Sequence, residues 1–379
     1  MKESVLKVQL LDLARQYRKI RKEVLEEAKK VFDSQHYVLG MNVSALESEI
    51  AAYCGARFAV GVASGTDAIL LSLMAAGVGP GDKVITSPFT FFATASSIAR
   101  LGAVPVFVDI DPLTYNIDPG SIEACLRKSR KGVKAIIPVH LYGQCAEMDG
   151  IRAIARKFRI KVVEDAAQSI GASYKGAMAC TLGDIGCLSF YPTKNLGGFG
   201  DGGMVVTNDE GLAESVRMLR VHGSRKRYYH EAIGVNSRLD ELQAAALRVK
   251  LRRLAGWTEK RVENAGRYGT LFGKMGQPEE VTLPHVGAGQ RPVFNQYVIR
   301  VRKRDELREH LSGLGIGTEI YYPMPLHLQK CFRYLGYRSG DFPVSERAAK
   351  EVLALPIYPE LKATEQRHVV SSIIKFYGK

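Results

Sequence analysis

The sequence predicts an α/β protein built on a predominantly parallel, doubly wound sheet, followed by a smaller α+β domain. Between residues 56 and 207, short β-branched runs alternate with segments of helical periodicity, as in sheets that carry helices on both faces. Polar residues gather where those runs end, which is the ligand-binding edge of such sheets. After about residue 266 the alternation stops and a segment containing several Gly and Pro residues begins.

Seven runs are expected to form the strands of the sheet, and most are separated by helical segments. In order along the chain they are RFAVGVAS, DKVITSP, AVPVFVDI, KAIIPVHLYG, IKVVEDAA, DIGCLSFYP and GGMVVTN. Residues 209–265 have the pattern of a long amphipathic helix, interrupted by the loop HGSRKRYYHEAIGVNSR. The smaller domain is expected to contain the strand FNQYVIRV, the helix RDELREHLSGLG and a closing helix from about residue 362.

Length and composition fit two unequal folded domains. A chain of 379 residues is long for one domain, since roughly 150 residues per domain is the usual expectation. The fractions of hydrophobic residues (46%) and charged residues (24%) are those of ordinary folded proteins. We therefore expect a large α/β domain over residues 1–250 and a small α+β domain over residues 251–379, with the N-terminal helix able to pack on the small domain.

The chain is strongly basic. Its 53 Lys and Arg against 39 Asp and Glu give a formal charge of +14, which favours nucleic acid, anionic lipid or a phosphorylated small molecule as partner. The basic runs RKIRKE, RKSRKGVK and VKLRRLAGWTEKR are spread along the chain, and each is more often a solvated helix face than a binding site. The sequence has no helix-turn-helix or RNP-like stretch. We therefore expect no nucleic-acid partner.

The sequence also indicates the cellular compartment. Its six cysteines are scattered without a CxxC pair, which suits a reducing environment. The N-terminus lacks a signal-peptide core, and no stretch reaches about 18 uninterrupted apolar residues. The sequence shows neither HExxH nor a Cys/His metal spacing, so no metal site is expected. We expect a cytoplasmic protein without a membrane segment.

The strongest chemical signal is the segment DIGCLSFYPTKNLGGFGDGGMVVTND. A strand delivers Ser189 and Lys194 into a glycine-rich turn, and a second strand follows at once. Glycines there allow a ligand and the backbone to approach closely. Lys194 can therefore form an imine with a carbonyl ligand, although a surface lysine that opens a turn is the commoner case for such a residue.

The same segment contains a G-x-G-x-x-G spacing formed by Gly198, Gly200 and Gly203. The dinucleotide fingerprint must follow a strand and open a helix. These glycines instead precede the apolar run MVVT, which is typical of a strand. A nicotinamide site is therefore rejected.

The segment KVVEDAAQS ends an apolar run in two carboxylates followed by small residues and Gln168. A carboxylate at a strand end can hold a protonated ring nitrogen, which an electron-sink cofactor requires. Asp165 is our candidate for that role. The alternative is that Asp165 caps a helix beginning at AAQ.

Two further segments provide candidate cofactor contacts. FAVGVASGTDAILLSLMAAG predicts a strand, a turn and an apolar helix, whose first amides at Gly65 and Thr66 can cradle a phosphate. An ordinary capped helix explains the same pattern. SPFTFFATASS brings Phe91 just after a strand, where its ring can stack on a flat cofactor, although core packing is commoner.

Taken together, VASGTDA, TFFAT, VVEDAAQS, LSFYPTKNLGGFGDGGMV and IGVNSRLDELQAA resemble the DegT/DnrJ/EryC1/StrS family of nucleotide-sugar aminotransferases, in the family's order. The resemblance runs from about residue 10 to the C-terminus. It implies fold type I of the aminotransferases that depend on pyridoxal 5′-phosphate (PLP), with a mostly parallel seven-stranded sheet. It also implies a homodimer with shared active sites.

The resemblance assigns roles by position. Lys194 would carry the cofactor as a Schiff base and act as the base that moves a proton during transamination. Asp165 would pair with the ring nitrogen. The remaining cofactor contacts would be Gln168 to the ring hydroxyl, Phe91 against the ring, Gly65, Thr66 and Ser189 at the phosphate, and Asn236 from the partner subunit.

Substrate contacts are also implied by the resemblance. The segment GTEIYYPMPLHLQ holds Tyr321 and Tyr322 where relatives have a His-Tyr pair near the sugar, and it also supplies His327. The departure at Tyr321 puts that contact in doubt. From its charge, the loop VHGSRKRYYH, with Arg225, Lys226 and Arg227, is expected to meet the diphosphate of the nucleotide, with a solvated loop as the alternative.

The implied function is transamination of a keto-hexose linked to dTDP or UDP, with L-glutamate as donor, in amino-sugar, polysaccharide or antibiotic biosynthesis. NSRLDELQAA resembles relatives that aminate the third carbon. Sugar dehydratases of the family have histidine in place of the lysine, so Lys194 favours transamination. Dehydration, amination of a non-sugar acceptor and, more distantly, a nucleic-acid-binding regulator remain the alternatives.

Overall fold

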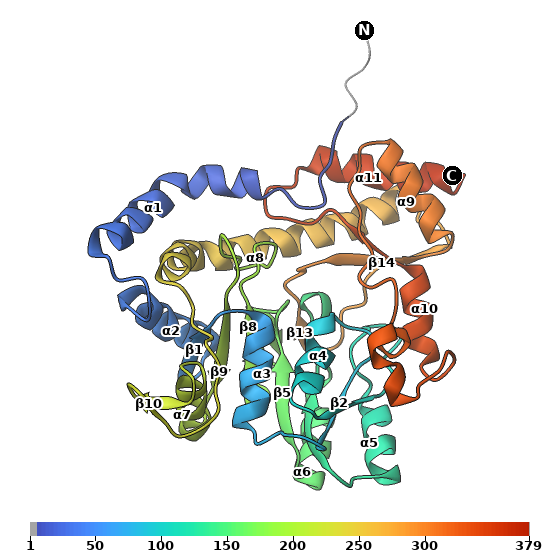
Figure 1. Ribbon diagram of the computed structural model, residues 1–379. Coiled ribbons are helices and arrows are strands. Elements are labelled where there is room, and N and C mark those ends of the chain that lie inside the picture. The colour runs from blue at the N-terminus through green and yellow to red at the C-terminus, as the bar shows by residue number, and fades with distance from the viewer. Residues whose placement is uncertain (1–5, 379) are drawn as a thin grey trace.

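A mostly parallel sheet of seven strands forms the centre of the protein (Figure 1). The computed structural model describes residues 6–378. The strand order is β1-β9-β8-β5-β4-β2-β3, and only β9 runs antiparallel to its neighbours. All seven predicted strands are present: β1 (Phe58–Val62), β2 (Lys83–Thr86), β3 (Val104–Phe107), β4 (Val133–Ile137), β5 (Lys161–Asp165), β8 (Ile185–Ser189) and β9 (Gly203–Thr207). The predicted fold class is confirmed.

Helices cover both faces of the sheet (Figure 1). One face packs against α3 (Gly65–Ala75), α4 (Phe92–Arg100) and α7 (Glu210–Leu219). The other packs against α2 (Met41–Cys54), α5 (Pro119–Lys128) and α6 (Met148–Phe158). Because both faces are buried, the central strands are continuous apolar runs rather than alternating ones, as parallel sheets require. With both faces covered, the ends of the strands are the part of the sheet at which side chains can meet a ligand.

A long helix, α8 (Glu241–Met275), links the two parts of the chain. Leu247 and Leu254 in its first half belong to the core beneath the sheet, whereas Tyr268 and Phe272 in its second half belong to the core of the C-terminal part. The expected boundary after residue 250 therefore falls inside one continuous helix, and the division into two domains stays a prediction. The loop that interrupts the predicted helix is present. The helix after it, α8, is also as predicted, but it ends at Met275 instead of residue 265.

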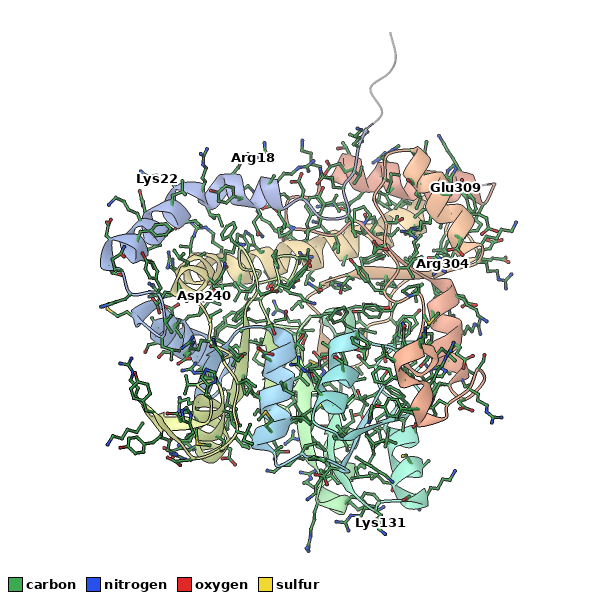
Figure 2. All side chains as sticks on the ribbon, in the orientation of Figure 1. Arg18, Lys22, Lys131, Asp240, Arg304 and Glu309 are labelled. Carbon is green, nitrogen blue, oxygen red and sulfur yellow. The ribbon has the colours of Figure 1, made fainter. Side chains whose placement is uncertain are left out.

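The N-terminal helix α1 (Leu13–Ser34) lies along α8 (Figure 1). Its Ile20 and Val24 pack against Val249 and Trp257 of α8. On its outer side, Arg18 and Lys22 point away from the molecule (Figure 2). The basic run RKIRKE is thus a solvated helix face with one buried apolar position, which is the commoner alternative for such runs.

The C-terminal part is a small α+β unit. Its sheet has β14 (Tyr297–Val301) between β12 (Val281–Thr282) and β15 (Val352–Leu355), both antiparallel to it. The strand β14 and the helices α9 (Arg304–Gly313) and α11 (Ala363–Phe376) match the predicted elements. The strand β15 was not predicted; it follows α10 (Pro343–Glu351) directly, without a turn signal between them.

Several short elements complete the fold. A small sheet joins β13 (Gln290–Arg291) to β6 (Ser173–Tyr174) and β7 (Ala177–Met178). A hairpin of β10 (Ser224–Lys226) and β11 (Tyr229–His230) projects beside α7. Three short 3₁₀ helices span Leu141–Gly143, Leu326–Leu328 and Lys330–Leu335. Within residues 6–378, no helix combines the length and the apolar character needed to span a bilayer.

Candidate active site

A cavity of about 600 Å³ lies at the carboxyl ends of the sheet strands. Asp165 ends β5 and Ser189 ends the neighbouring strand β8, so sheet pairing brings these two positions to the same edge. The start of α3 closes one side. Of the predicted residues, the following line this cavity: Gly65, Thr66, Phe91, Asp165, Gln168, Ser189, Lys194, Tyr321 and Tyr322.

Lys194 enters the cavity from the turn that follows β8. Its amide donates to the Tyr191 carbonyl at 2.9 Å, which closes this turn. Burial lowers the pKa of Lys194, and the nearby charge of Asp165 partly opposes that effect. A lower pKa leaves more of the amine neutral at a given pH, and the neutral amine is the form that attacks a carbonyl carbon.

The turn after Lys194 is fixed from the side away from the cavity. The Asn195 side chain is buried; its amide donates to the Val293 carbonyl at 3.1 Å and its oxygen accepts from the Asn295 amide at 2.8 Å. Further on, Lys250 of α8 donates to the Gly197 carbonyl at 2.5 Å. These bonds tie the lysine-bearing turn to both parts of the chain.

Asp165 presents a buried carboxylate to the cavity. The residue is 5% exposed, and its two oxygens accept from the Thr94 hydroxyl at 2.7 Å and from the Ala167 amide at 3.2 Å. In the described part of the chain, no Lys, Arg or His forms an ion pair with it. A buried anion held only by neutral donors favours a cationic ligand. Asp165 caps no helix, because the residues after it form turns.

The start of α3 forms an anion cradle. The Ser64 hydroxyl accepts from the Asp67 amide at 3.1 Å, so the helix is capped. The amides of Gly65 and Thr66 lie in the first turn, where no helical carbonyl precedes them to accept their hydrogen bonds. Gly65 lies so close to Ser189 that a Cβ on it would stand 2.6 Å from the Ser189 Cβ. The ordinary capped helix and the phosphate cradle therefore coexist here.

Aromatic rings and one side-chain amide also line the cavity. The Phe91 ring is 57% exposed and lies 6.2 Å from the Tyr322 ring, centroid to centroid. The Gln168 oxygen accepts from the Tyr142 amide at 2.6 Å, and its nitrogen donates to the Tyr322 hydroxyl at 3.2 Å. Gln168 is thus held in place by protein groups, with one amide hydrogen left for a ligand.

Two predicted substrate contacts do not line this cavity. Arg225 lies on β10, where it forms ion pairs with Glu214 at 3.2 Å and Glu231 at 3.3 Å. His327 is buried, and its Nε2 lies 3.1 Å from a Glu346 carboxylate oxygen. Their substrate-binding roles stay predictions.

Asn236 lines an adjoining cavity of about 660 Å³. The two cavities share Ser64 and Asp201. Asn236 is thus near the phosphate cradle without lining the main cavity in a single chain. Its action on a partner subunit stays a prediction.

The structure also adds residues that sequence reasoning did not single out. Thr94 contacts Asp165 directly, and Tyr142 holds Gln168. Thr193, Asp201 and Gln296 join the lining. Thr94 lies within the segment TFFAT, four residues after Thr90, and this spacing of two threonines is the sequence signal that indicates it.

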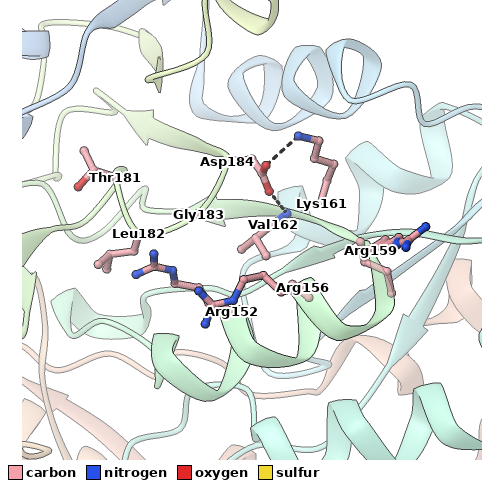
Figure 3. Close-up of a pocket in the computed structure, with 11 residues that line it drawn as sticks. Arg152, Arg156, Arg159, Lys161, Val162, Thr181, Leu182, Gly183 and Asp184 are labelled. Carbon is pink, nitrogen blue, oxygen red and sulfur yellow. Dashed lines mark hydrogen bonds and ion pairs between the residues drawn. The ribbon is translucent and has the colours of Figure 1, made fainter.

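A separate depression of about 470 Å³ lies at the opposite end of β5 (Figure 3). Arg152, Arg156 and Arg159 belong to α6 and its end, and Lys161 pairs with Asp184 at 2.8 Å. None of the predicted site residues lines it. Because Lys161 starts β5 and Asp165 ends it, the strand separates this basic patch from the main cavity.

The chain is similar to known proteins over nearly its whole length. The model of the DegT/DnrJ/EryC1/StrS aminotransferase family matches residues 18–374. A Geobacillus stearothermophilus protein named "Pleiotropic regulatory protein" is 52% identical, covering 98% of this chain and 99% of that one. A UDP-2-acetamido-2-deoxy-3-oxo-D-glucuronate aminotransferase of Pseudomonas aeruginosa is 41% identical, covering 97% of this chain and 99% of its own.

A solved structure is similar over almost the same span. The S. venezuelae protein DesV, in complex with a ketimine intermediate, superposes with a TM-score of 0.94 at 40% identity, covering 98% of this chain and 99% of that one. The family model, both relatives and this structure thus each extend over nearly the whole chain. The resemblance noted in the sequence motifs is confirmed, and the protein belongs to the DegT/DnrJ/EryC1/StrS aminotransferase family.

Proposed function

We propose that this protein transfers the amino group of L-glutamate to the keto carbon of a nucleotide-linked hexose, most readily the third carbon. The observation that carries the proposal is one cavity that holds Lys194, Asp165 and the amides of α3 together. Family membership supports it. The name of the P. aeruginosa relative, which specifies a 3-oxo UDP-sugar, supports the third carbon.

The residues of the cavity fit PLP, the cofactor of this aminotransferase family. The buried Asp165 carboxylate suits a protonated ring nitrogen, the α3 amides suit a phosphate, and the exposed Phe91 ring suits a flat ring. When bound, PLP supplies a carbonyl that carries the amino group and a ring that accepts an electron pair. The protein must supply the proton transfers.

Lys194 is the residue suited to move those protons. Within residues 6–378, Lys194 is the only Lys or Arg that lines the main cavity. Burial lowers its pKa, which brings the amine nearer to the neutral form that a general base requires. Asp165 complements it, because an anion buried beside the ring position keeps a proton there instead of accepting it.

The homodimer and its shared site are also part of the proposal. Asn236 of one subunit would complete the phosphate site of the other. Mixed dimers test this. One subunit carries Lys194→Ala and the other Asn236→Ala; if Asn236 serves the partner's site, each mixed dimer contains one fully wild-type site. We expect activity that neither homodimer has. Activity no higher than in the two homodimers would show that Asn236 serves its own subunit.

A panel of amino-nucleotide-sugars tests the substrate. The purified PLP-bound protein is mixed in turn with the 3-amino and 4-amino forms of UDP- and dTDP-hexoses, with an amino-cyclitol and with L-glutamate. Conversion of the bound cofactor to its amine form is followed by absorbance. We expect conversion by L-glutamate and by a 3-amino sugar. Conversion by an amino-cyclitol alone would instead favour the non-sugar alternative, and conversion by none would contradict the proposal.

The regulatory alternative is tested separately. The name of the 52% identical relative and the basic depression around Arg152 are the two observations in its favour. We propose an enzyme that binds no nucleic acid and resides in the cytoplasm. A binding curve for duplex DNA titrated with salt should show no affinity near physiological ionic strength. Tight binding that persists there would revive the alternative.

A further inference from the structure

The Asp165 carboxylate receives a hydrogen bond from a helix that approaches the cavity from another part of the sheet. The Thr94 hydroxyl of α4 donates to Oδ2 of Asp165 at 2.7 Å, and both residues are buried. The Ala167 amide donates to the other oxygen at 3.2 Å. One donor is therefore local to Asp165, whereas the other comes from 71 residues earlier in the chain.

A second threonine, Thr90, lies next to the Thr94 hydroxyl, and the bond from Thr94 to Asp165 determines the direction of the hydrogen bond between the two threonines. The Thr90 and Thr94 hydroxyl oxygens lie 3.2 Å apart. Each hydroxyl has a single hydrogen, and that of Thr94 is committed to the charged acceptor. Thr90 must therefore donate to Thr94. A hydroxyl that accepts one hydrogen bond becomes a better donor for the next, so Thr90 strengthens the hydrogen bond that Thr94 donates to Asp165.

The arrangement differs from the usual fate of a helical threonine. A Thr hydroxyl within a helix commonly bonds the backbone carbonyl one turn earlier, whereas Thr94 points across to β5. Thr94 is fully buried, so its hydroxyl has no water to replace a lost partner. A buried hydroxyl aimed at a functional carboxylate indicates a role beyond filling space.

We propose that Thr94 is a positioning residue that holds the Asp165 carboxylate aimed at the ring nitrogen of the cofactor. The proposal rests on the function proposed above, since it needs Asp165 to face that ring. Thr94 does not contact the reacting atoms. It acts through Asp165. Removing the Thr94 hydroxyl keeps the Asp165 carboxylate but weakens its interaction with the protonated ring nitrogen.

Three variants test this role. Thr94→Val keeps the shape and removes the hydroxyl, and Thr94→Ser restores a hydroxyl in a smaller side chain. Thr207→Val is the matched control, because Thr207 is also buried and donates to a backbone carbonyl, that of Asp184, at 2.8 Å. Thr207 ends β9 at the far end of the sheet from Ser189.

The first readout is the pH titration of the absorbance of the bound cofactor, without substrate. A hydrogen bond to a charged group contributes enough to change an equilibrium by about tenfold to a hundredfold. In Thr94→Val we expect the midpoint of this absorbance titration to shift upward by about one pH unit. A ring that holds its proton less firmly carries less positive charge on average, so it repels the proton that titrates elsewhere on the cofactor less strongly. Thr94→Ser and Thr207→Val should titrate as the wild type does.

The second readout is kcat, measured alongside the dissociation constant of the cofactor from equilibrium dialysis. We expect Thr94→Val to lower kcat by about tenfold or more, and Thr94→Ser to recover most of that loss. If Thr94→Val does not fold, Thr94→Ala compared with Thr94→Ser provides the same contrast. A wild-type titration midpoint in folded Thr94→Val or Thr94→Ala would overturn the role of Thr94. Failure of the wild type itself to bind PLP would instead overturn the proposed function.

Discussion

The side-chain amide of Gln168 donates a hydrogen bond to the Tyr322 hydroxyl at 3.2 Å. This bond joins the turn after β5 to a segment of the C-terminal part across the cavity. The Tyr142 hydroxyl adds a second link by donating to the Tyr321 carbonyl. The cavity therefore takes its shape only when the two parts of the chain are docked, and the links between them should influence catalysis.

Tyr322→Phe removes the hydroxyl of the first link and keeps the ring against Phe91. A neutral hydrogen bond contributes about 0.5–1.5 kcal/mol, so we expect kcat/KM for the keto-sugar to fall about threefold to tenfold. Steady-state kinetics measure this. Tyr334→Phe is the control, since Tyr334 is 64% exposed. An equal loss in both variants would show that the effect is not specific to the link.

Lys194→Ala should abolish turnover, because it removes both the covalent attachment and the base. Borohydride reduction of the wild type followed by peptide mass spectrometry should locate the cofactor on the peptide that contains Lys194. Lys194→Arg should be inactive as well, since it keeps a charge but cannot form the bond. Turnover within about tenfold of the wild type in Lys194→Ala would contradict the mechanism.

The lowered pKa of Lys194 predicts how the apoenzyme recaptures PLP. The neutral amine is the reactive form, so the rate of covalent recapture should rise with pH. Because burial lowers the pKa, the rise should be centred below the ordinary lysine value of 10.5. Stopped-flow absorbance across pH 6 to 10 measures the midpoint. A rate that shows no sign of levelling by pH 10, so that its fitted midpoint is 10.5 or higher, would mean that the buried environment does not favour the neutral amine.

Gly65→Ala should weaken cofactor binding. The added Cβ would stand 2.6 Å from the Ser189 Cβ and 3.0 Å from its hydroxyl, so the α3 amides would be displaced from the cradle. We expect the dissociation constant for PLP to rise by about tenfold or more, since one misplaced charge-assisted bond is worth about 1.5–3 kcal/mol. Gly79→Ala is the control, because a Cβ there meets no atom within 4 Å.

Lys250 predicts a pH-dependent stability. The residue is 4% exposed, lies over the Phe199 ring, and burial lowers its pKa to about 8. Below pH 8 both folded and unfolded chains hold the proton, so the full cost of burying the charge is present. Between pH 8 and 10.5 the folded chain releases the proton first, and stability rises with pH.

The free energy of unfolding of the wild type relative to Lys250→Met should therefore increase between pH 7 and 10, by up to ~3 kcal/mol. Urea unfolding at each pH measures this difference. The exposed Lys260→Met is the control and should give a difference that does not vary with pH. A flat difference for Lys250→Met would show that the folded protein keeps this lysine charged.

Much of the site could be predicted from the sequence because it depends on local pattern. Asp165 and Ser189 follow apolar runs that had to be strands, and parallel strands end at one edge. The glycines around Lys194 and the short turn at Gly65 have the same local origin. The seven strands, the lysine and its carboxylate were therefore predictable without coordinates.

Only the tertiary structure decided which distant groups meet. The bond from Thr94 to Asp165 spans 71 residues and that from Gln168 to Tyr322 spans 154. Arg225, a predicted substrate contact, forms ion pairs with Glu214 and Glu231. Periodicity reports which face of an element is buried, but the partner across that face depends on how whole helices and sheets pack. The sequence determined the reactive groups, and packing determined what holds and tunes them.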